Sequence, residues 1–247
     1  MAAIAEEAKE LVDLASERGL VVRILGGLAV RILCPHLPPR SRDGQDLDLA
    51  TRGSFRSGFA ELLTERGYVG DRHFNALHGN KQLYFVHGDT GLPVDVVIDK
   101  LEMCHTLVFA DRLARMPYTL DPLDLLLTKL QIVQLNEKDV DDCLQLLVSY
   151  PLGDSDDAGT MDLRVFRALV GDDWGWWRTV TQNLDRIRRV LDEEPRAAIE
   201  GGELDPVRQL QTLFQAVEEA PKSRRWKLRS RVGDRVRWYK LPEEEAH

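Results

Sequence analysis

The chain has 247 residues, and 43% of its side chains are hydrophobic, which is enough for a sizeable core in one large domain or a domain with an appendage. Its 33 basic and 41 acidic residues give a net charge of -8, which argues against a protein whose whole surface is basic and binds nucleic acid. Charge-free stretches are far shorter than the roughly 20 apolar residues of a spanning helix, so we expect no membrane partner. Acidic residues near the start argue against a secretory leader, and we expect the protein in the cytoplasm.

Three cysteines, Cys34, Cys104 and Cys143, are far apart and form no CxxC pair. This spacing fits neither a disulfide framework nor a zinc site. We expect three buried thiols.

The N-terminal part alternates helix and strand signals. Residues 4–18 carry apolar side chains at helical spacing, and the β-branched run 20–25 predicts a strand. Gly26 and Gly27 follow this strand, and 28–33 can continue as a helix that ends before Pro35. The order is strand, glycine turn, helix.

The next segments predict more strands. Residues 46–50 alternate in polarity as a half-buried strand does, and a helix follows before Gly67. The runs 81–87 and 92–99 flank a polar turn with two glycines and predict a β-hairpin.

Leucines and valines then recur at helical spacing, first after Pro122 and again after Asn136. We therefore expect an α/β (α+β) fold, with a small mixed sheet flanked by helices and followed by a helical C-terminal region. The predicted domains are 1–150, a helical 151–221, and a basic, aromatic segment at 222–247.

Three aspartates on two predicted strands are the most informative group. Residues at i and i+2 of a strand share a face, so Asp46 and Asp48 present two carboxylates side by side. Asp95 lies within a run of valines, where a carboxylate is costly to bury unless a cation meets it. Mg²⁺ prefers such oxygen ligands. In the structural alternative, Asp46 caps a turn and Asp48 lies in solvent.

Other residues extend this site. Asp99 follows Asp95 by four residues and is a rival third carboxylate if the strand is regular. The pair Gly26 and Gly27 lets backbone N–H groups approach a phosphate, although many such pairs are only turns. Arg42 could neutralise triphosphate oxygens or remain a solvated loop arginine.

These motifs together resemble the minimal nucleotidyltransferase fold of the polymerase-beta superfamily, and the downstream helices resemble its AbiEii-type branch. The resemblance covers about residues 20–150. The segments that carry it are Gly26-Gly27, Asp46-Leu47-Asp48-Leu49, Val94-Asp95-Val96, Leu125-Leu126-Leu127-Thr128-Lys129-Leu130-Gln131, Lys138-Asp139 and Asp142.

The resemblance implies a role for each matching position. The implied metal ligands are Asp46, Asp48 and Asp95, for two Mg²⁺ ions, with Mn²⁺ as an alternative. The resemblance also implies that the glycine pair holds a nucleoside triphosphate such as ATP, that Lys129 reaches the phosphates, and that Asp139 supports the site. It further implies a toxin-like role beside a protein antitoxin.

The C-terminal segment concentrates positive charge. Residues 222–247 carry nine basic and four acidic side chains, and Trp226, Trp238 and Tyr239 lie among them. Arginines neutralise phosphates and aromatic faces stack on bases, so an RNA partner is one reading. The other is that the segment folds back on the acidic body of the same chain.

We therefore expect a Mg²⁺-dependent nucleotidyltransferase that moves a nucleoside monophosphate from NTP to an acceptor hydroxyl and releases pyrophosphate. The acceptor would be RNA, with tRNA as the first candidate, or a small hydroxylated molecule such as an aminoglycoside. A DxD glycosyltransferase and a catalytically degenerate nucleotide-binding protein are the alternatives.

Overall fold

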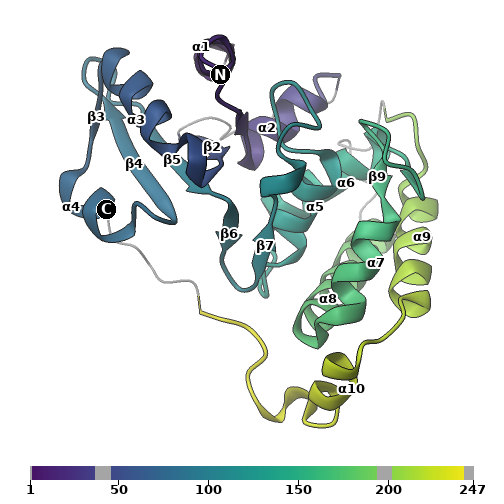
Figure 1. Cartoon of the computed structure of the whole chain (residues 1–247). Helices are drawn as coiled ribbons and strands as arrows, with labels where there is room; N and C mark the ends of the chain where they lie inside the picture. The colour runs from purple at the N-terminus through teal and green to yellow at the C-terminus, as the bar shows by residue number, and fades with distance from the viewer. Residues whose placement is uncertain (1, 37–45, 194–201, 242–247) are drawn as a thin grey trace. The chain divides into compact units, whose positions relative to one another are not determined.

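The computed structural model describes residues 2–36, 46–193 and 202–241, and these form two compact units (Figure 1). The first unit contains the described residues up to Leu101, apart from His36, together with Val108–Asp121. The second contains Glu102–Leu107 and the described residues from Pro122 onward. The predicted domain boundaries at residues 150 and 221 remain predictions. In the structure, the helices after Pro122 belong to the second unit.

The first unit is built around one sheet. Its elements in chain order are α1 (Ala2–Glu17), β1 (Val22–Ile24), α2 (Gly26–Leu33), β2 (Leu47–Thr51), η1 (Gly53–Phe55), α3 (Arg56–Glu65), β3 (Tyr68–Gly70), α4 (Arg72–His78), β4 (Gln82–His87), β5 (Pro93–Ile98) and η2 (Ala110–Arg112). Two short strands, β6 (Lys100–Glu102) and β7 (Thr106–Val108), lie where the chain passes between the units.

Five strands form the mixed sheet in the order β1-β2-β5-β4-β3. Strands β2 and β5 run parallel at its centre, and the other neighbouring pairs are antiparallel. Leu47, Leu49, Val94 and Val96 are fully buried, whereas the alternate residues of the same central strands include polar side chains. Because side chains alternate along a strand, one face of the sheet packs on the core and the other carries polar groups.

Helices α1 and α3 pack on each other and on the sheet's outer strands β1 and β3. The apolar stripe of α1 is completely buried at Ala8, Leu11 and Ala15, as its helical spacing predicts. Gly19 ends this helix at φ 71°, and Leu20 donates its N–H to the carbonyl of Ala15. Glycine adopts this left-handed conformation without steric cost, so it is a natural helix stop.

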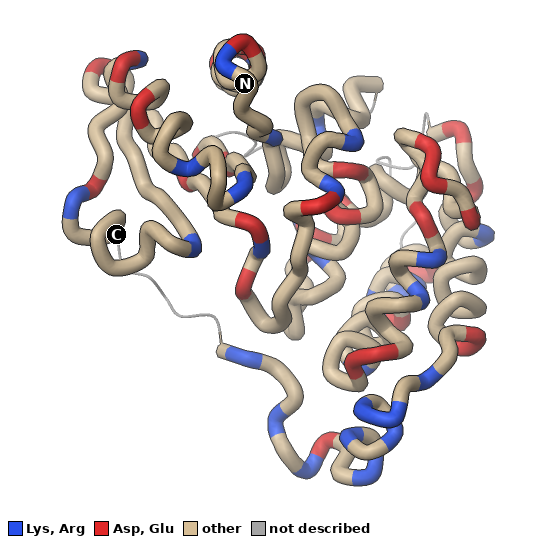
Figure 2. The backbone as a smooth tube through the Cα atoms, viewed as in Figure 1, with Lys and Arg blue, Asp and Glu red and all other residues tan. Residues whose placement is uncertain are grey.

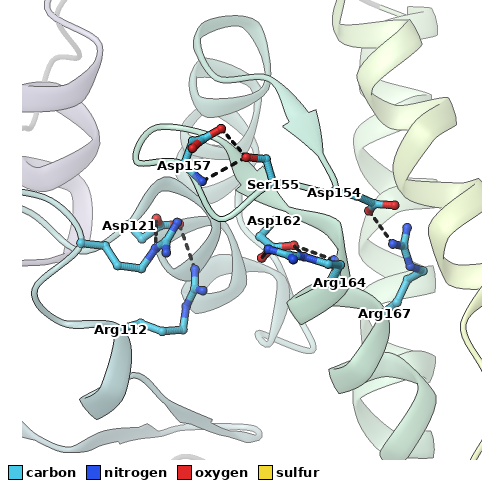
Figure 3. Close-up of polar contacts among 9 residues, drawn as sticks. Arg112, Asp121, Asp154, Ser155, Asp157, Asp162, Arg164 and Arg167 are labelled. Carbon is cyan, nitrogen blue, oxygen red and sulfur yellow. Dashed lines mark hydrogen bonds and ion pairs between the residues drawn. The ribbon is translucent and has the colours of Figure 1, made fainter.

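The second unit is mainly helical. Its elements are α5 (Pro122–Leu130), α6 (Glu137–Ser149), β8 (Leu152–Gly153), β9 (Met161–Asp162), α7 (Leu163–Asp172), α8 (Trp174–Glu193), α9 (Pro206–Glu219), α10 (Arg224–Ser230) and η4 (Gly233–Arg235). Asp162 caps α7 by accepting the N–H of Arg164 at 2.9 Å, and it also pairs with the Arg164 guanidinium (Figure 3). Arg167 pairs with Asp154, which lies in the loop between β8 and β9.

The predicted fold class is confirmed: a small mixed sheet flanked by helices is followed by a helical region. The predicted hairpin is present as β4 and β5. The expectation that everything beyond residue 150 is helical is wrong in one place, because β8 and β9 pair there in parallel. The sequence pattern also missed β3 and α4, since a three-residue strand and a seven-residue helix are too short to show a period.

All three cysteines are free and buried, as expected. Within the described residues, no helix is both long and apolar enough to cross a bilayer.

Candidate active site

Two of the three predicted carboxylates lie side by side. Asp48 on β2 and Asp95 on β5 are direct partners in the parallel register. Partners in neighbouring strands are about 4.8 Å apart and point to the same face of the sheet. Both side chains are half-buried, on the face opposite the apolar core. The tertiary fold therefore brings together two acidic groups that are distant in sequence.

Gln82 on β4 orients Asp95. Its Nε2 donates to Oδ1 of Asp95 at 2.6 Å. The Cα partner of Asp95 on β4 is Tyr84, and Gln82 precedes it by two residues, so all three side chains share one face. The hydrogen bond defines one side of the Asp95 carboxylate and restricts its rotation. Nothing in the sequence pattern identified Gln82 as part of the site.

The glycine turn lies directly against Asp48. Gly26 has φ 72°, and a Cβ atom placed on it would lie 2.3 Å from Oδ2 of Asp48. The backbone at residue 26 thus approaches the carboxylate more closely than any side chain would allow. The backbone N–H of Leu25 also donates to the carbonyl of Asp48 at 3.0 Å, which ties the turn to β2.

Helix α2 begins at this turn. Its N-cap residue, Leu25, makes no side-chain capping hydrogen bond. The first N–H groups of a helix have no partner within the helix, and they favour an anion together with the helix dipole. Gly26 and Gly27 are the first two residues of α2, and their phosphate contact stays a prediction.

Asp46 is placed differently. It lies in a bend just before β2 and its side chain is exposed. Among the described residues, no group of three or more His, Cys, Asp and Glu side chains could hold a metal ion. Asp46, Asp48 and Asp95 therefore do not form a closed three-carboxylate cluster, and their role as metal ligands stays a prediction. Arg42 lies outside the described residues.

Asp99 occupies a different position from Asp95. It has φ 60°, which takes it out of the strand, so the assumption of a regular strand fails at this residue. Its Oδ1 accepts the N–H of Gly53 at 3.0 Å, at the start of η1. This places the Asp99 carboxylate beyond the end of β5, several residues from the register position that Asp48 and Asp95 share.

Lys129 and Asp139 lie in the second unit and contact each other. The Nζ of Lys129 is 3.0 Å from Oδ1 of Asp139 and 2.9 Å from Oδ2 of Asp142. Burial opposes the charged ammonium, but the carboxylates of Asp142 and Asp139 outweigh it and hold the pKa of Lys129 above its ordinary value. The Lys129 side chain is only 13% exposed, so its positive charge is balanced by the two carboxylates of α6. A phosphate contact of Lys129 stays a prediction.

A buried ion cluster around Asp121 lies at the end of a segment that pairs with β1, the strand before Gly26. Asp121 is buried, and its carboxylate accepts from Arg112 at 3.1 Å and from Arg115 at 2.8 Å (Figure 3). The segment before it pairs in parallel with β1 through a bridge between Ile24 and Thr119. Asp121 thus ends a segment that runs alongside β1 toward Gly26. Arg112 ends the short 3-10 helix η2 and Arg115 lies in the loop after it; neither segment has a periodic pattern, so sequence reasoning missed both arginines.

The C-terminal segment folds onto helices of its own unit. Trp226 packs edge to face on Trp177, and Trp238 does so on Trp174. Trp174 and Trp177 of α8 are therefore packing residues. This arrangement matches the intramolecular reading of the segment, and Trp226 and Trp238 are used in packing.

The charges of this segment remain at the surface. Figure 2 shows Lys and Arg recurring along it. Asp234 is the acidic residue in its described part. The exposed basic residues are Arg224, Arg225, Lys227, Arg231, Arg235, Arg237 and Lys240.

No protein-family model matches the sequence, and no curated protein matches it significantly. Among solved structures, it is similar to a lincosamide antibiotic adenylyltransferase with lincomycin bound, at 16% identity and TM-score 0.42 over 57% of this chain and 94% of that one. It is similar to an antigenic nucleotidyltransferase-like protein from Paracoccidioides brasiliensis, at 12% identity and TM-score 0.43 over 89% and 94%.

A further similarity is to the CCA-adding enzyme of Thermotoga maritima in complex with tRNA, at 13% identity and TM-score 0.30 over 85% of this chain and 50% of that one. At TM-scores this low, the similarities do not identify the family of the chain.

Proposed function

We propose that this protein is a nucleotidyltransferase, which transfers a nucleoside monophosphate from NTP to an acceptor hydroxyl with release of pyrophosphate. The observation that carries the proposal is the register pairing of Asp48 with Asp95, with the Gly26 turn against the Asp48 carboxylate. A pair of carboxylates beside the first N–H groups of a helix provides for both a cation and a phosphate chain.

The residues present suit a hard divalent cation. Mg²⁺ binds proteins through one or two carboxylates and takes its remaining ligands from water and substrate phosphates, so Asp48 and Asp95 would hold it. When bound, the ion would neutralise the triphosphate and increase the acidity of the acceptor hydroxyl. Asp46, which is exposed in the bend before β2, would be the third carboxylate of the site, as the sequence predicts.

The chain's own groups would then have separate tasks. The N–H groups at Gly26 and Gly27 bind phosphate oxygens and orient the nucleotide. Asp95, oriented by Gln82, accepts the proton of the acceptor hydroxyl. We choose Asp95 over Asp99 because the Asp99 carboxylate already accepts the N–H of Gly53 beyond the end of the strand. Catalysis of this kind depends mainly on positioning and charge neutralisation.

For the acceptor we propose RNA. The support is the row of exposed basic side chains from Arg224 to Lys240, which lies on helices of its own unit and could contact a phosphate backbone. Because Trp226 and Trp238 pack inward, this contact would be electrostatic, without base stacking. Binding of RNA should therefore weaken steeply as salt rises.

The test is transfer of label from each of the four α-labelled NTPs, with Mg²⁺, to a tRNA pool or to an aminoglycoside panel. We expect Asp48→Asn and Asp95→Asn to lower the transfer rate at least about 100-fold, since each removes a charged ligand from the site. Asp99→Asn is the matched control, because this carboxylate lies outside the site, and it should retain most of the wild-type rate.

Label on the aminoglycosides and not on RNA would keep the enzyme class and replace the acceptor. Absence of transfer to every acceptor, or equal rates for wild type and Asp48→Asn, would contradict the proposed function.

A further inference from the structure

A cavity of about 450 Å³ lies in the first unit, on the side of the sheet that faces α1. Its walls come from the start of α1, from β3 and from the turn that joins β4 to β5. Ile4, Leu92 and Pro93 give it an apolar lining, and Glu7, Tyr68 and His87 bring polar groups to it. A volume of this size accommodates a small organic molecule.

Glu7 brings a negative charge to this cavity. The hydroxyl of Tyr68 donates to Oε1 of Glu7 at 2.8 Å. Burial and the Glu7 carboxylate raise the pKa of Tyr68 well above its ordinary value, so the phenol remains protonated and keeps donating. A single neutral donor orients the carboxylate without neutralising it, and a cation in the cavity would find a fixed partner.

His87 adds a hydrogen-bond donor. Its Nδ1 accepts the backbone N–H groups of Asp89 at 3.2 Å and Thr90 at 3.3 Å. Because Nδ1 is an acceptor in both contacts, the proton of the neutral ring is on Nε2. The ring also packs edge to face on Tyr68, with 4.8 Å between ring centroids, which holds its orientation. The imidazole belongs to the cavity lining, and Nε2 carries the one N–H that its ring can donate.

The cavity is separate from the candidate active site. His87 is the register partner of Tyr68 and follows Leu83 and Phe85 at even spacing, so these side chains share the apolar face of the sheet. Asp48 and Asp95 lie on the other face of the same sheet. A ligand in the cavity would not occupy the nucleotide position.

We propose that this cavity is a binding site for a small primary amine that has an apolar body and one hydrogen-bond acceptor, such as a hydroxyl. The ammonium group pairs with Glu7, the acceptor receives the Nε2–H of His87, and the apolar body packs on Ile4, Leu92 and Pro93. Each of these groups belongs to the cavity lining, and none is part of the nucleotidyltransferase site.

The experiment titrates phenylethanolamine into the full-length protein and follows the ring signals of His87 and Tyr68 by NMR. We expect saturable shifts for this probe, and at least about tenfold weaker binding of phenylethanol, which lacks the amine.

Glu7→Gln keeps an oxygen that can accept from Tyr68 but removes the charge, and it should weaken phenylethanolamine binding to a similar extent. Glu10→Gln is the matched control on the same helix, because Glu10 pairs with Arg66 at 2.6 Å outside the cavity, and it should bind as wild type does.

Absence of saturable shifts at His87 would overturn the proposal, and so would equal affinity of wild type for phenylethanolamine and phenylethanol. The second comparison uses wild-type protein alone, so it decides the matter even where Glu7→Gln alters folding.

Discussion

At the scale of single residues, the contact between Gly26 and Asp48 makes the sharpest prediction. Gly26→Ala forces an L side chain into φ 72° and places its Cβ 2.3 Å from Oδ2 of Asp48, so the carboxylate must move. The backbone strain alone costs about 1–2 kcal/mol. We expect this loss of stability in urea unfolding, together with a loss of NTP-dependent transfer greater than the stability change explains.

Gly19→Ala is the matched control for this variant. Gly19 has nearly the same φ, 71°, and nothing lies within 4 Å of the position of its Cβ. It should show the backbone cost and keep its activity. Equal activity of the Gly26→Ala and Gly19→Ala variants would mean that the position of Asp48 does not matter for function.

At the scale of elements, the α5–α6 pair depends on the ion cluster of Lys129 with Asp139 and Asp142. Lys129→Met leaves two buried carboxylates without their cation, and we expect it to lower the free energy of unfolding by about 3–5 kcal/mol. Asp139→Asn leaves the pair of Lys129 with Asp142 intact, so its loss should be clearly smaller. Urea titrations of both variants measure the difference.

If Lys129→Met unfolds no more easily than Asp139→Asn but loses activity, Lys129 acts on substrate rather than on the helix pair. That outcome would favour the phosphate contact that the family resemblance implies over the structural role that its burial indicates.

At the scale of the whole molecule, His105 joins segments of the second unit that are far apart in sequence. His105 Nε2 is 2.8 Å from the hydroxyl of Thr179 on α8, and the same hydroxyl accepts from Trp238 of the C-terminal segment at 3.0 Å. Burial lowers the pKa of His105 to about 4, although Asp173 opposes the shift, so the native ring is neutral at pH 7. A neutral imidazole can accept the Thr179 proton, whereas a protonated one cannot.

This burial predicts a pH dependence of stability. In the unfolded chain His105 binds a proton below about pH 6.5, but in the native protein it binds one only near pH 4. The unfolded state thus binds more protons in this window, and stability falls as the pH falls through it. We expect wild type to lose about 3 kcal/mol more than His105→Gln between pH 6.5 and pH 4.

Urea unfolding at a series of pH values measures this difference. The control is His73→Gln, because His73 is an exposed histidine on α4, in the first unit, and is not part of this contact. Parallel profiles for wild type and His105→Gln would show that His105 titrates normally in the native protein.

Short-range pattern determined much of this molecule in advance. The fold class, the hairpin of β4 and β5, the glycine pair at the start of α2 and the two helices after Pro122 follow from periodicity and turn chemistry, which depend on neighbouring residues only. The half-buried position of Asp48 also follows from the alternation along β2. Such features are local, so the amino-acid order suffices to predict them.

Only the tertiary structure decided which distant residues meet. The parallel pairing of β2 with β5 places Asp48 beside Asp95. The positive φ of Asp99, the rival candidate, takes that residue out of the strand. The same holds for Gln82 beside Asp95 and for the enclosure of Lys129 by two carboxylates. Strand register and side-chain burial arise from packing between remote segments, and no local pattern contains that information.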